Sequence, residues 1–292
     1  MFLTDARLMA LWLLLPSCAV AQEPSIEHHI EKVVGNFHYI GGLAWSREGH
    51  LYFSDSPRGS VNQWTPNQGV SSLPVELKAP AGLAFDEHGR LLACEAGARR
   101  IVRIKANNTL DPIVTAFEGH HLNSPRELAV RKDGTVFFTD PAFGSAHDTM
   151  ALPFHGVYRA GSKGEALVLA RWDKRPGGIA VSPDGKTLYV ADSDERTIHV
   201  FDLDRQGNSS NDRILISGIE GVPNALQTDD KGRLYIAAHQ VLVYSREGKR
   251  LGQIETGERP TSLAFGEAGS RTLFVGTRTS IYRVEMGEAH QE

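Results

Sequence analysis

Short runs of apolar residues recur along the chain, separated by polar turns. Six of them share one pattern, in which a residue that is usually small precedes a Leu-Ala-like pair. They are Gly42-Leu43-Ala44-Trp45, Gly82-Leu83-Ala84-Phe85, Glu127-Leu128-Ala129-Val130, Gly178-Ile179-Ala180-Val181, Ala225-Leu226-Gln227-Thr228 and Ser262-Leu263-Ala264-Phe265. Each is followed by a polar turn containing glycine, such as Asp184-Gly185, and then by a second apolar run. Such turns between β-rich runs are typical of β-hairpins.

Further apolar runs complete most repeats. Third runs include Ile101-Val102-Arg103-Ile104 and Ile198-His199-Val200-Phe201, and a fourth is visible as Ala166-Leu167-Val168-Leu169. Four-stranded antiparallel units that recur about every forty to fifty residues are the signature of a β-propeller. The six copies predict an all-β fold, a six-bladed β-propeller of four-stranded antiparallel blades. A generic β-sandwich is the alternative, and six copies in register argue against it.

The last repeat ends after its third strand. Residues 26–34 precede the first repeat and have the apolar alternation of a strand. We expect this N-terminal strand to close the ring as the missing outer strand of the sixth blade, which removes the open edges of the sheet.

The first 21 residues have the features of a signal peptide. Arg7 precedes an apolar run over residues 8–15, and Ala19-Val20-Ala21 matches a cleavage site. The run is too short to span a bilayer, and a buried helix is the alternative. We therefore expect an exported protein, periplasmic or secreted, with residues 22–292 forming one propeller domain. Lipid anchoring at Cys18 is a minor alternative, because Pro16 makes a poor lipoprotein signal.

Cleavage after Ala21 would leave Cys94 as the single cysteine, so no internal disulfide is expected. Cys94 ends an apolar run and is expected to be an inert thiol in the core. The net charge of -4 gives no reason to expect nucleic acid, whose binders carry a basic stripe. We expect a monomer that binds a small molecule.

The order of the strands predicts where a site would lie. The residues just before and at the start of each inner run should meet at one mouth of the central tunnel. The first such column is Gly41, Ala81, Arg126, Gly177, Asn224 and Thr261, and the second is Gly42, Gly82, Glu127, Gly178, Ala225 and Ser262. Only the third repeat carries charges in these columns, Arg126 and Glu127. With glycine at positions 41, 42, 177 and 178, the mouth is expected to be roomy.

A third column stands at the ends of the second runs. It contains Asp55, Glu95, Asp140, Asp192, Ala238 and Thr277. These carboxylates could form a metal site. The alternative, which we favour, is that each one accepts hydrogen bonds from backbone N–H groups of its own repeat.

Several phrases resemble the SMP-30/gluconolactonase/LRE family, in order along the mature chain. They are Cys94-Glu95-Ala96-Gly97, Leu122-Asn123-Ser124-Pro125, Phe138-Thr139-Asp140-Pro141, Arg175-Pro176-Gly177-Gly178, Val222-Pro223-Asn224-Ala225 and Thr272-Leu273-Phe274-Val275. The resemblance implies a six-bladed propeller that hydrolyses sugar lactones and related esters. It also implies one divalent cation, often calcium, in the tunnel mouth, held by a Glu, an Asn and an Asp, with an Asn-Asp pair beside it touching substrate and water.

The sequence departs from the family at these positions. The Glu position is Gly41, the Asn position is Gly177 and the Asp position is Asn224, while the Asn-Asp pair is Arg126-Glu127. One amide oxygen does not hold calcium against water. We therefore predict no metal or other cofactor.

Two interpretations remain. In the first, the chain is a lactone or ester hydrolase in which Arg126 replaces the cation and stabilises an oxyanion. Glu127, or His120 or His121, would act as the base. In the second, the propeller is not catalytic and binds a small anionic ligand, whose carboxylate or phosphate pairs with Arg126. Arg126 and Glu127 could also be a surface ion pair without a function.

Four further residues are predicted to contact the ligand. They are Asn123, Asn224, His121 and His239. The histidines 120, 121 and 239 could instead form a zinc or copper site, since imidazole suits these metals, although adjacent histidines seldom point the same way.

Overall fold

The computed structural model describes residues 28–143, 150–161, 164–267 and 271–286. The predicted signal peptide (residues 1–21), Cys18 included, lies outside these ranges. Among the residues described, no helix combines the length and the hydropathy needed to cross a membrane.

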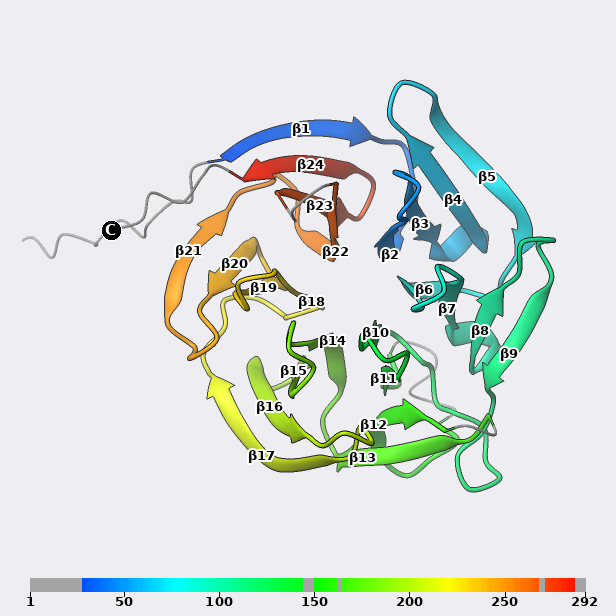
Figure 1. Cartoon of the computed structure of the whole chain (residues 1–292), viewed down its shortest axis with the longest axis vertical. Coiled ribbons are helices and arrows are strands. Elements are labelled where there is room, and N and C mark those ends of the chain that lie inside the picture. The colour runs from blue at the N-terminus through cyan, green and yellow to red at the C-terminus, as the bar shows by residue number, and fades with distance from the viewer. Residues whose placement is uncertain (1–27, 144–149, 162–163, 268–270, 287–292) are drawn as a thin grey trace, which may run out of the picture.

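The chain forms six four-stranded sheets that surround a central axis, as Figure 1 shows. Blade 1 contains β2 (Ile40–Trp45), β3 (Leu51–Asp55), β4 (Ser60–Thr65) and β5 (Gly69–Glu76). Blade 2 contains β6 (Pro80–Phe85), β7 (Leu91–Glu95), β8 (Arg100–Ile104) and β9 (Leu110–Val114). Blade 3 contains β10 (Leu128–Val130), β11 (Val136–Asp140), β12 (His155–Ala160) and β13 (Ala166–Trp172).

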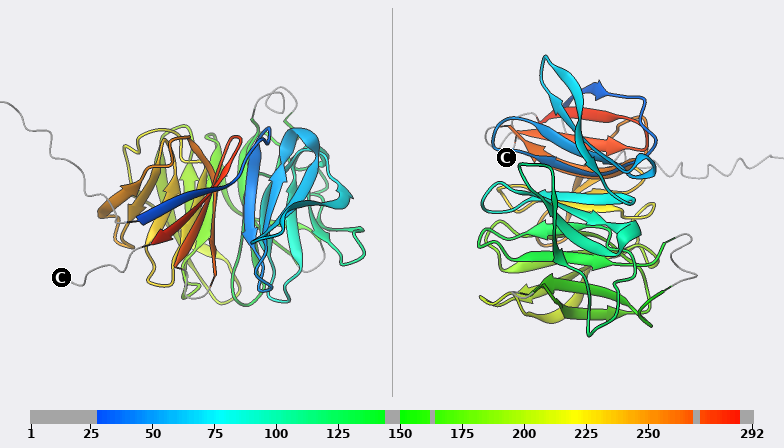
Figure 2. Two further views of the ribbon diagram at one scale, coloured as in Figure 1. Left: turned by 90° about the horizontal axis from the view of Figure 1, so that it is seen from above. Right: turned by 90° about the vertical axis from the view of Figure 1, so that its right-hand side faces the viewer.

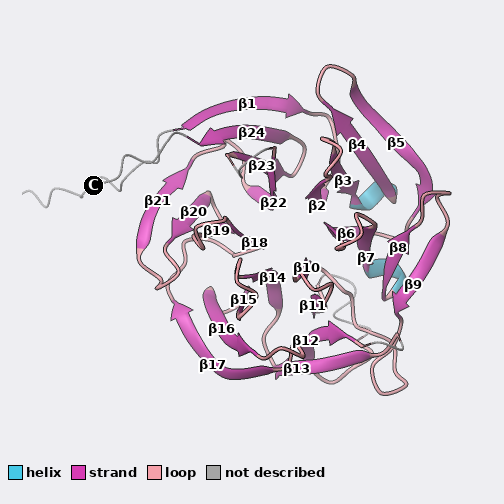
Figure 3. Cartoon of the chain, viewed as in Figure 1, coloured by secondary structure: helices cyan, strands magenta, loops and turns pink. Residues whose placement is uncertain are grey.

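Blade 4 contains β14 (Pro176–Val181), β15 (Thr187–Asp192), β16 (Thr197–Leu203) and β17 (Ser209–Ile216). Blade 5 contains β18 (Ala225–Thr228), β19 (Leu234–Ala237), β20 (Val241–Tyr244) and β21 (Arg250–Ile254). Blade 6 contains β22 (Pro260–Gly266), β23 (Thr272–Thr277) and β24 (Ile281–Met286), together with β1 (His28–Val34). The helical content of the described residues is two short 3-10 turns, η1 (Ser56–Arg58) and η2 (Ala96–Ala98), drawn in cyan in Figure 3. The predicted six-bladed propeller is confirmed.

The ring is closed by the N-terminal strand. β1 pairs antiparallel with β24, with His28 opposite Met286 and Ile30 opposite Val284. In the side views of Figure 2, β1 runs along the outer edge of the disc beside β24. The predicted closure is therefore confirmed over residues 28–34, and it joins the two ends of the propeller in one sheet; residues 26 and 27 lie outside the described ranges.

The hydrophobic core lies between the blades. Phe137 and Val157 of blade 3 pack with Ile179 and Val190 of blade 4 in one of these layers. The layer between blades 6 and 1 completes the circle, where Trp45 is stacked on Phe274 with ring centroids 5.0 Å apart. Burying one large apolar side chain contributes about 1.5–3 kcal/mol. Each layer therefore holds its two blades together, and the tunnel mouth rests on a rigid ring.

In four of the six blades the inner strand begins with a β-bulge. In blades 1, 2, 4 and 6 the register between the inner and second strands shifts at this point. In blades 1, 2 and 4 the bulge residues are Gly41-Gly42, Ala81-Gly82 and Gly177-Gly178. Bulges re-aim side chains and often lie beside active sites. We call the face at which the inner strands begin the mouth face.

Candidate functional site

Arg126 and Glu127 occupy the bulge position of blade 3, just before β10. One residue of the second strand, Thr139, faces both: Arg126 N–H donates to Thr139 O (2.9 Å), and Thr139 N–H donates to Glu127 O (3.0 Å). The neighbouring blades hold the same segment, because Gly82 N–H donates to Arg126 O (2.7 Å) and the Thr139 hydroxyl donates to Gly177 O (2.8 Å). The only charged pair in the two mouth columns thus stands on a backbone fixed by blades 2, 3 and 4.

The side chain of Arg126 reaches across the mouth to blade 5. Its Nη2 donates to Asn224 Oδ1 at 3.3 Å, and its Cζ lies 4.8 Å from the centroid of the Phe143 ring. The Nε atom is buried and has no hydrogen-bond partner among the described residues. Within the same residues no carboxylate forms an ion pair with Arg126. The guanidinium is therefore held in place while retaining hydrogen-bonding capacity and net charge for a ligand.

Glu127 is a carboxyl group enclosed by protein and only partly exposed. Its Oε2 lies beside Gly82, where a Cβ atom would be only 2.9 Å away. Burial raises the pKa of Glu127 from 4.5 to about 8, and the nearby charge of Arg126 opposes that rise. A carboxyl group with a pKa near the working pH is what general acid-base catalysis requires.

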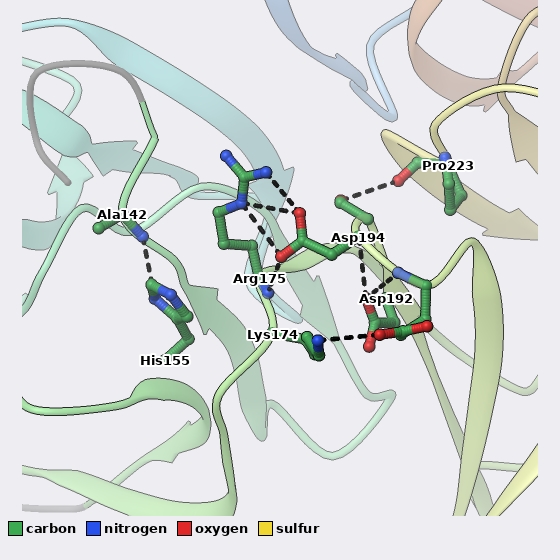
Figure 4. Close-up of polar contacts among 9 residues, drawn as sticks. Ala142, His155, Lys174, Arg175, Asp192, Asp194 and Pro223 are labelled. Atoms are coloured by element: carbon green, nitrogen blue, oxygen red, sulfur yellow. Dashed lines mark hydrogen bonds and ion pairs between the residues drawn. The ribbon is translucent and has the colours of Figure 1, made fainter.

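A second arginine, which the repeat pattern did not single out, faces the same ring. The Cζ of Arg175 lies 4.9 Å from the centroid of Phe143. Arg175 precedes Pro176 and so stands outside the two columns, while Phe143 follows β11 in a segment without a repeat signature. Asp194 holds Arg175: it accepts the backbone N–H of Arg175 at 2.9 Å and Nε at 3.0 Å, and it is also bonded to Nη2 (Figure 4).

Asn123 does not line the mouth as predicted. It is 1% exposed, and its amide is bonded to backbone: Nδ2 donates to Phe154 O (2.9 Å), and Oδ1 accepts the N–H groups of Ala151 and Leu152 at 3.1 Å. These bonds hold the segment after β11 instead of a ligand. At the start of that segment, Ala142 N–H donates to His155 Nδ1 at 3.3 Å, as Figure 4 shows.

The predicted histidine contacts are not brought together. His120 and His121 are exposed, and neither is hydrogen-bonded to Arg126 or Glu127. His239 is bonded to Glu220, with Nδ1 3.1 Å from its backbone oxygen and Nε2 3.7 Å from Oε2. No group of three or more His, Cys, Asp or Glu residues in the described ranges is arranged to hold a metal.

The acidic third column has the backbone-binding role that we favoured. Asp55 accepts the N–H groups of His38 and Tyr39, and Glu95 accepts that of Lys78. Asp140 accepts those of Asn123 and Ser124, both at 2.7 Å, and Asp192 accepts those of Asp194 and Glu195. Asp140 is fully buried, and burial raises its pKa to about 7 despite these bonds. By accepting these hydrogen bonds, the four carboxylates fix the backbone of the loops at the mouth.

Cys94 lies in the core next to this site. It is 0% exposed, and burial raises its pKa well above the usual value. A protonated, buried thiol is a poor nucleophile, in agreement with the prediction of an inert core residue.

The glycines do not make the mouth roomy, which corrects the expectation from the sequence. A Cβ atom at Gly41 would lie 2.7 Å from Ser56 Oγ, and one at Gly177 would contact Ser193 Oγ and lie 2.7 Å from Pro223 O. At Gly42 and Gly178 the backbone of the next blade fills the space, 2.7 Å from such an atom. Thus the two positions corresponding to the family's Glu and Asn lack ligand atoms, and serine hydroxyls stand where those side chains would begin. The residues present do not fit a divalent cation.

Comparisons with known proteins agree with the fold and with these motifs. Residues 41–279 match the family described as SMP-30/Gluconolactonase/LRE-like region. A gluconolactonase from Zymomonas mobilis is 28% identical over 287 residues, covering 87% of this chain and 80% of the relative. A pentonolactonase from Haloferax volcanii is 24% identical over 239 residues, covering 79% and 78%.

Among solved structures, a gluconolactonase from Xanthomonas campestris superimposes with a TM-score of 0.82 at 27% identity, covering 92% of this chain and 96% of its own. Because the family match spans most of the sequence, the chain belongs to the SMP-30/gluconolactonase/LRE family.

Proposed function

We propose that the protein hydrolyses a lactone or a related ester in the tunnel mouth, with Arg126 and Glu127 in place of the family's cation-centred machinery. The relatives named as gluconolactonase and pentonolactonase support the reaction class. The observation that carries the proposal is the blade 3 bulge. It places a guanidinium without a carboxylate partner in the described residues beside a carboxyl group whose pKa is about 8.

Arg126 is suited to bind the carbonyl oxygen of the substrate by hydrogen bonds. Its N–H groups donate hydrogen bonds, and its position is already fixed by Asn224 and Phe143. A donor fixed before the reaction stabilises the oxyanion of a tetrahedral intermediate without reorganisation. Asn224 accepts a hydrogen bond from Arg126 Nη2 and acts mainly by positioning Arg126.

Glu127 is suited to move the proton. In its ionised form it takes a proton from water while the water oxygen bonds to the carbonyl carbon. When the ring C–O bond breaks, the protonated Glu127 returns that proton to the leaving alkoxide. Lactone and water are thereby converted to one hydroxy acid, and Glu127 regains its starting state. The carboxylic acid group formed loses its proton to solvent, and the resulting carboxylate remains next to Arg126 until the product diffuses away.

No step is assigned to a metal ion. The described residues at the family's ligand positions are Gly41, Gly177 and Asn224, and they present one amide oxygen, which is already bonded to Arg126. Hard cations such as calcium take six to eight oxygen ligands. The same loss of ligands favours the second function, a non-catalytic propeller that binds a small anion at Arg126.

The test is a lactonase assay on metal-free protein. We expect purified protein to hydrolyse a sugar lactone or an aryl ester at the same rate with and without EDTA. Replacing Arg126 by alanine should lower kcat/KM by about 10²–10³-fold, the usual cost of removing an oxyanion donor. Arg259→Ala is the matched control, because Arg259 is an exposed arginine directly before an inner strand and does not contact the site.

Two outcomes would overturn the proposal. Activity that requires calcium would show that a cation is held in spite of the missing ligands. No turnover on a panel of lactones and esters, combined with an anion that raises the Tm of wild type but not of Arg126→Ala, would establish the non-catalytic binder.

A further inference from the structure

Two arginines from different blades share one aromatic ring at the mouth. Arg126 precedes β10 of blade 3 and Arg175 precedes β14 of blade 4, and their Cζ atoms lie 4.8 and 4.9 Å from the centroid of Phe143. The two guanidinium carbons are therefore less than about 10 Å apart. A small sugar acid can span that separation with a hydrogen bond at each end.

Arg175 is fixed before any ligand arrives. Asp194 accepts both its backbone N–H and its side-chain Nε and Nη2, and Asp194 is itself held because its own N–H donates to Asp192 Oδ1 at 2.9 Å (Figure 4). The Nη1 group of Arg175 makes no hydrogen bond within the described part of the chain. The side chain is only partly exposed, at 36%. An arginine held in this way loses little conformational entropy when it binds a carboxylate or a phosphate.

While Glu127 is protonated, the charges at the mouth leave an excess of positive charge. Asp194 neutralises Arg175, whereas Arg126 has no ion-pair partner among the residues described, and Glu127 is largely protonated below its pKa of about 8. A ligand with one negative group would therefore complete the charge balance. The ligand would also meet two preorganised hydrogen-bond donors, Arg175 and Arg126, of which Arg126 is already required for the carbonyl oxygen.

We propose that Arg175 on Phe143 forms an anion subsite next to Arg126, and that the preferred substrate is a lactone carrying a second, negatively charged group. The proposal rests on the proposed function, and Arg126 and Arg175 then divide the substrate between them. Arg126 receives the lactone carbonyl, and Nη1 of Arg175 receives the anionic group at the other end. Arg175 is thus a residue that determines specificity and takes no part in proton transfer.

The test compares three lactones that differ in charge. Glucono-1,5-lactone is neutral, glucaro-1,4-lactone carries a carboxylate, and 6-phosphoglucono-1,5-lactone carries a phosphate. We expect one of the anionic lactones to have a kcat/KM at least tenfold above that of the neutral one, and the faster of the two identifies the anion. Replacing Arg175 by methionine should reduce this ratio by about tenfold to a hundredfold, as expected for a charge-assisted hydrogen bond.

The controls separate the subsite from general charge and from folding. Arg259→Met removes the same charge from the equivalent place before Pro260 in blade 6 and should leave the ratio unchanged. Phe143→Leu keeps both arginines but removes their shared ring, and it should give a smaller loss than Arg175→Met. Thermal melting of each variant confirms that it is folded.

The outcomes are distinct from those of the proposed function. Hydrolysis with a ratio near one in wild type, or an unchanged ratio in Arg175→Met, would overturn the subsite while the lactonase stands. If no lactone is hydrolysed, the proposed function fails, and calorimetric titration with glucarate decides the subsite alone. Binding that is lost in Arg175→Met would support it, and no binding to wild type would overturn it.

Discussion

Blades 3 and 4 both begin with a bulge before the inner strand, but the residues in the two bulges are of opposite kinds. The bulge of blade 3 holds Arg126 and Glu127, and the bulge of blade 4 holds Gly177 and Gly178. In blade 4 a Cβ atom at Gly178 would lie 2.7 Å from the backbone of Ala225 in blade 5. In blade 3 the neighbour on one side is Gly82, and the Glu127 carboxylate lies in the space that a side chain at 82 would need.

This difference shows that the ring offers room for side chains in only some of its bulges. A charged pair fits in blade 3 because blade 2 contributes a glycine beside it. At Gly42 and Gly178, close contact with the backbone of the next blade excludes even one methyl group. The position of the site consequently depends as much on the glycines as on the charged residues. Substituting residues of either kind should have a predictable effect on activity or stability.

Replacing Glu127 by glutamine should have the largest effect on catalysis. The wild-type kcat/KM should rise with pH and level off above about 8, because the base must be ionised and its pKa is about 8. Glutamine cannot take a proton, so kcat/KM should fall by about 10²–10⁴-fold and lose the inflection. A pH-rate profile of both proteins, from pH 5.5 to 9.5, measures this. An inflection that persists in the variant would assign the base elsewhere.

The same substitution changes how stability depends on pH. Burial raises the folded-state pKa of Glu127 above its usual 4.5, so the folded protein binds more protons than the unfolded chain between pH 4.5 and about 8. The free energy of unfolding should therefore fall as pH rises through this window. Asp140, with a raised pKa of about 7, acts in the same direction in both proteins. Denaturant unfolding should show a steeper loss in wild type than in Glu127→Gln.

Replacing Gly178 by alanine should have an intermediate effect, on stability. The added Cβ would be forced against backbone atoms of Ala225 and Leu226, all 2.7 Å away, and backbone cannot move aside as a side-chain end can. Overpacking of this kind typically costs about 1–3 kcal/mol. Gly35→Ala is the matched control, because its Cβ would meet only the flexible side chain of Lys32, at 3.1 Å. Equal melting temperatures for the two variants would refute the packing argument.

The sequence predicted the fold because the propeller repeats its signals. Leu-Ala-like pairs mark the inner strands, and glycine turns mark the hairpins. Each signal recurs in the six repeats, so an ambiguous copy such as Leu226-Gln227 is resolved by the others. The closing strand was also predictable, since the sixth repeat lacks one strand and residues 28–34 can supply it. Periodicity is a local property, and a propeller is built almost entirely from neighbouring strands.

The site was predicted only in part. Arg126 and Asn224 meet because they share the first column, which the repeat alignment reveals, and Glu127 follows Arg126 in the second column. Asn123 is three residues from Arg126, yet its amide faces the backbone of the segment before β12, a long-range contact that no periodicity encodes. Arg175 and Phe143 were not identified as site residues because they lie in loops outside the repeat. The expectation of a roomy mouth at the glycines was wrong, because the sequence of one strand does not show how close the atoms of the next blade lie.

Replacing Asn224 by alanine should have the smallest effect on catalysis. The variant loses the 3.3 Å hydrogen bond from Arg126 Nη2, which joins the blade 3 bulge to blade 5, while the Phe143 ring and the Arg126 backbone stay in place. A single side-chain hydrogen bond of this kind is worth about 0.5–1.5 kcal/mol, or roughly twofold to tenfold in kcat/KM. Steady-state kinetics should show the change in kcat/KM, with the pH inflection from Glu127 unmoved.

Thr261→Ala is the comparison in the same column. The Thr261 hydroxyl donates to Ile40 O at 2.7 Å and so joins blade 6 to blade 1 without contacting Arg126. We expect this variant to lose stability and to keep its turnover, the reverse of Asn224→Ala. If Asn224→Ala lost activity as severely as Arg126→Ala, Asn224 would have to contact the substrate itself. If its activity were unchanged, the Phe143 ring and the bulge alone would suffice to hold the guanidinium, and the site would be contained within blade 3 and its neighbouring glycines.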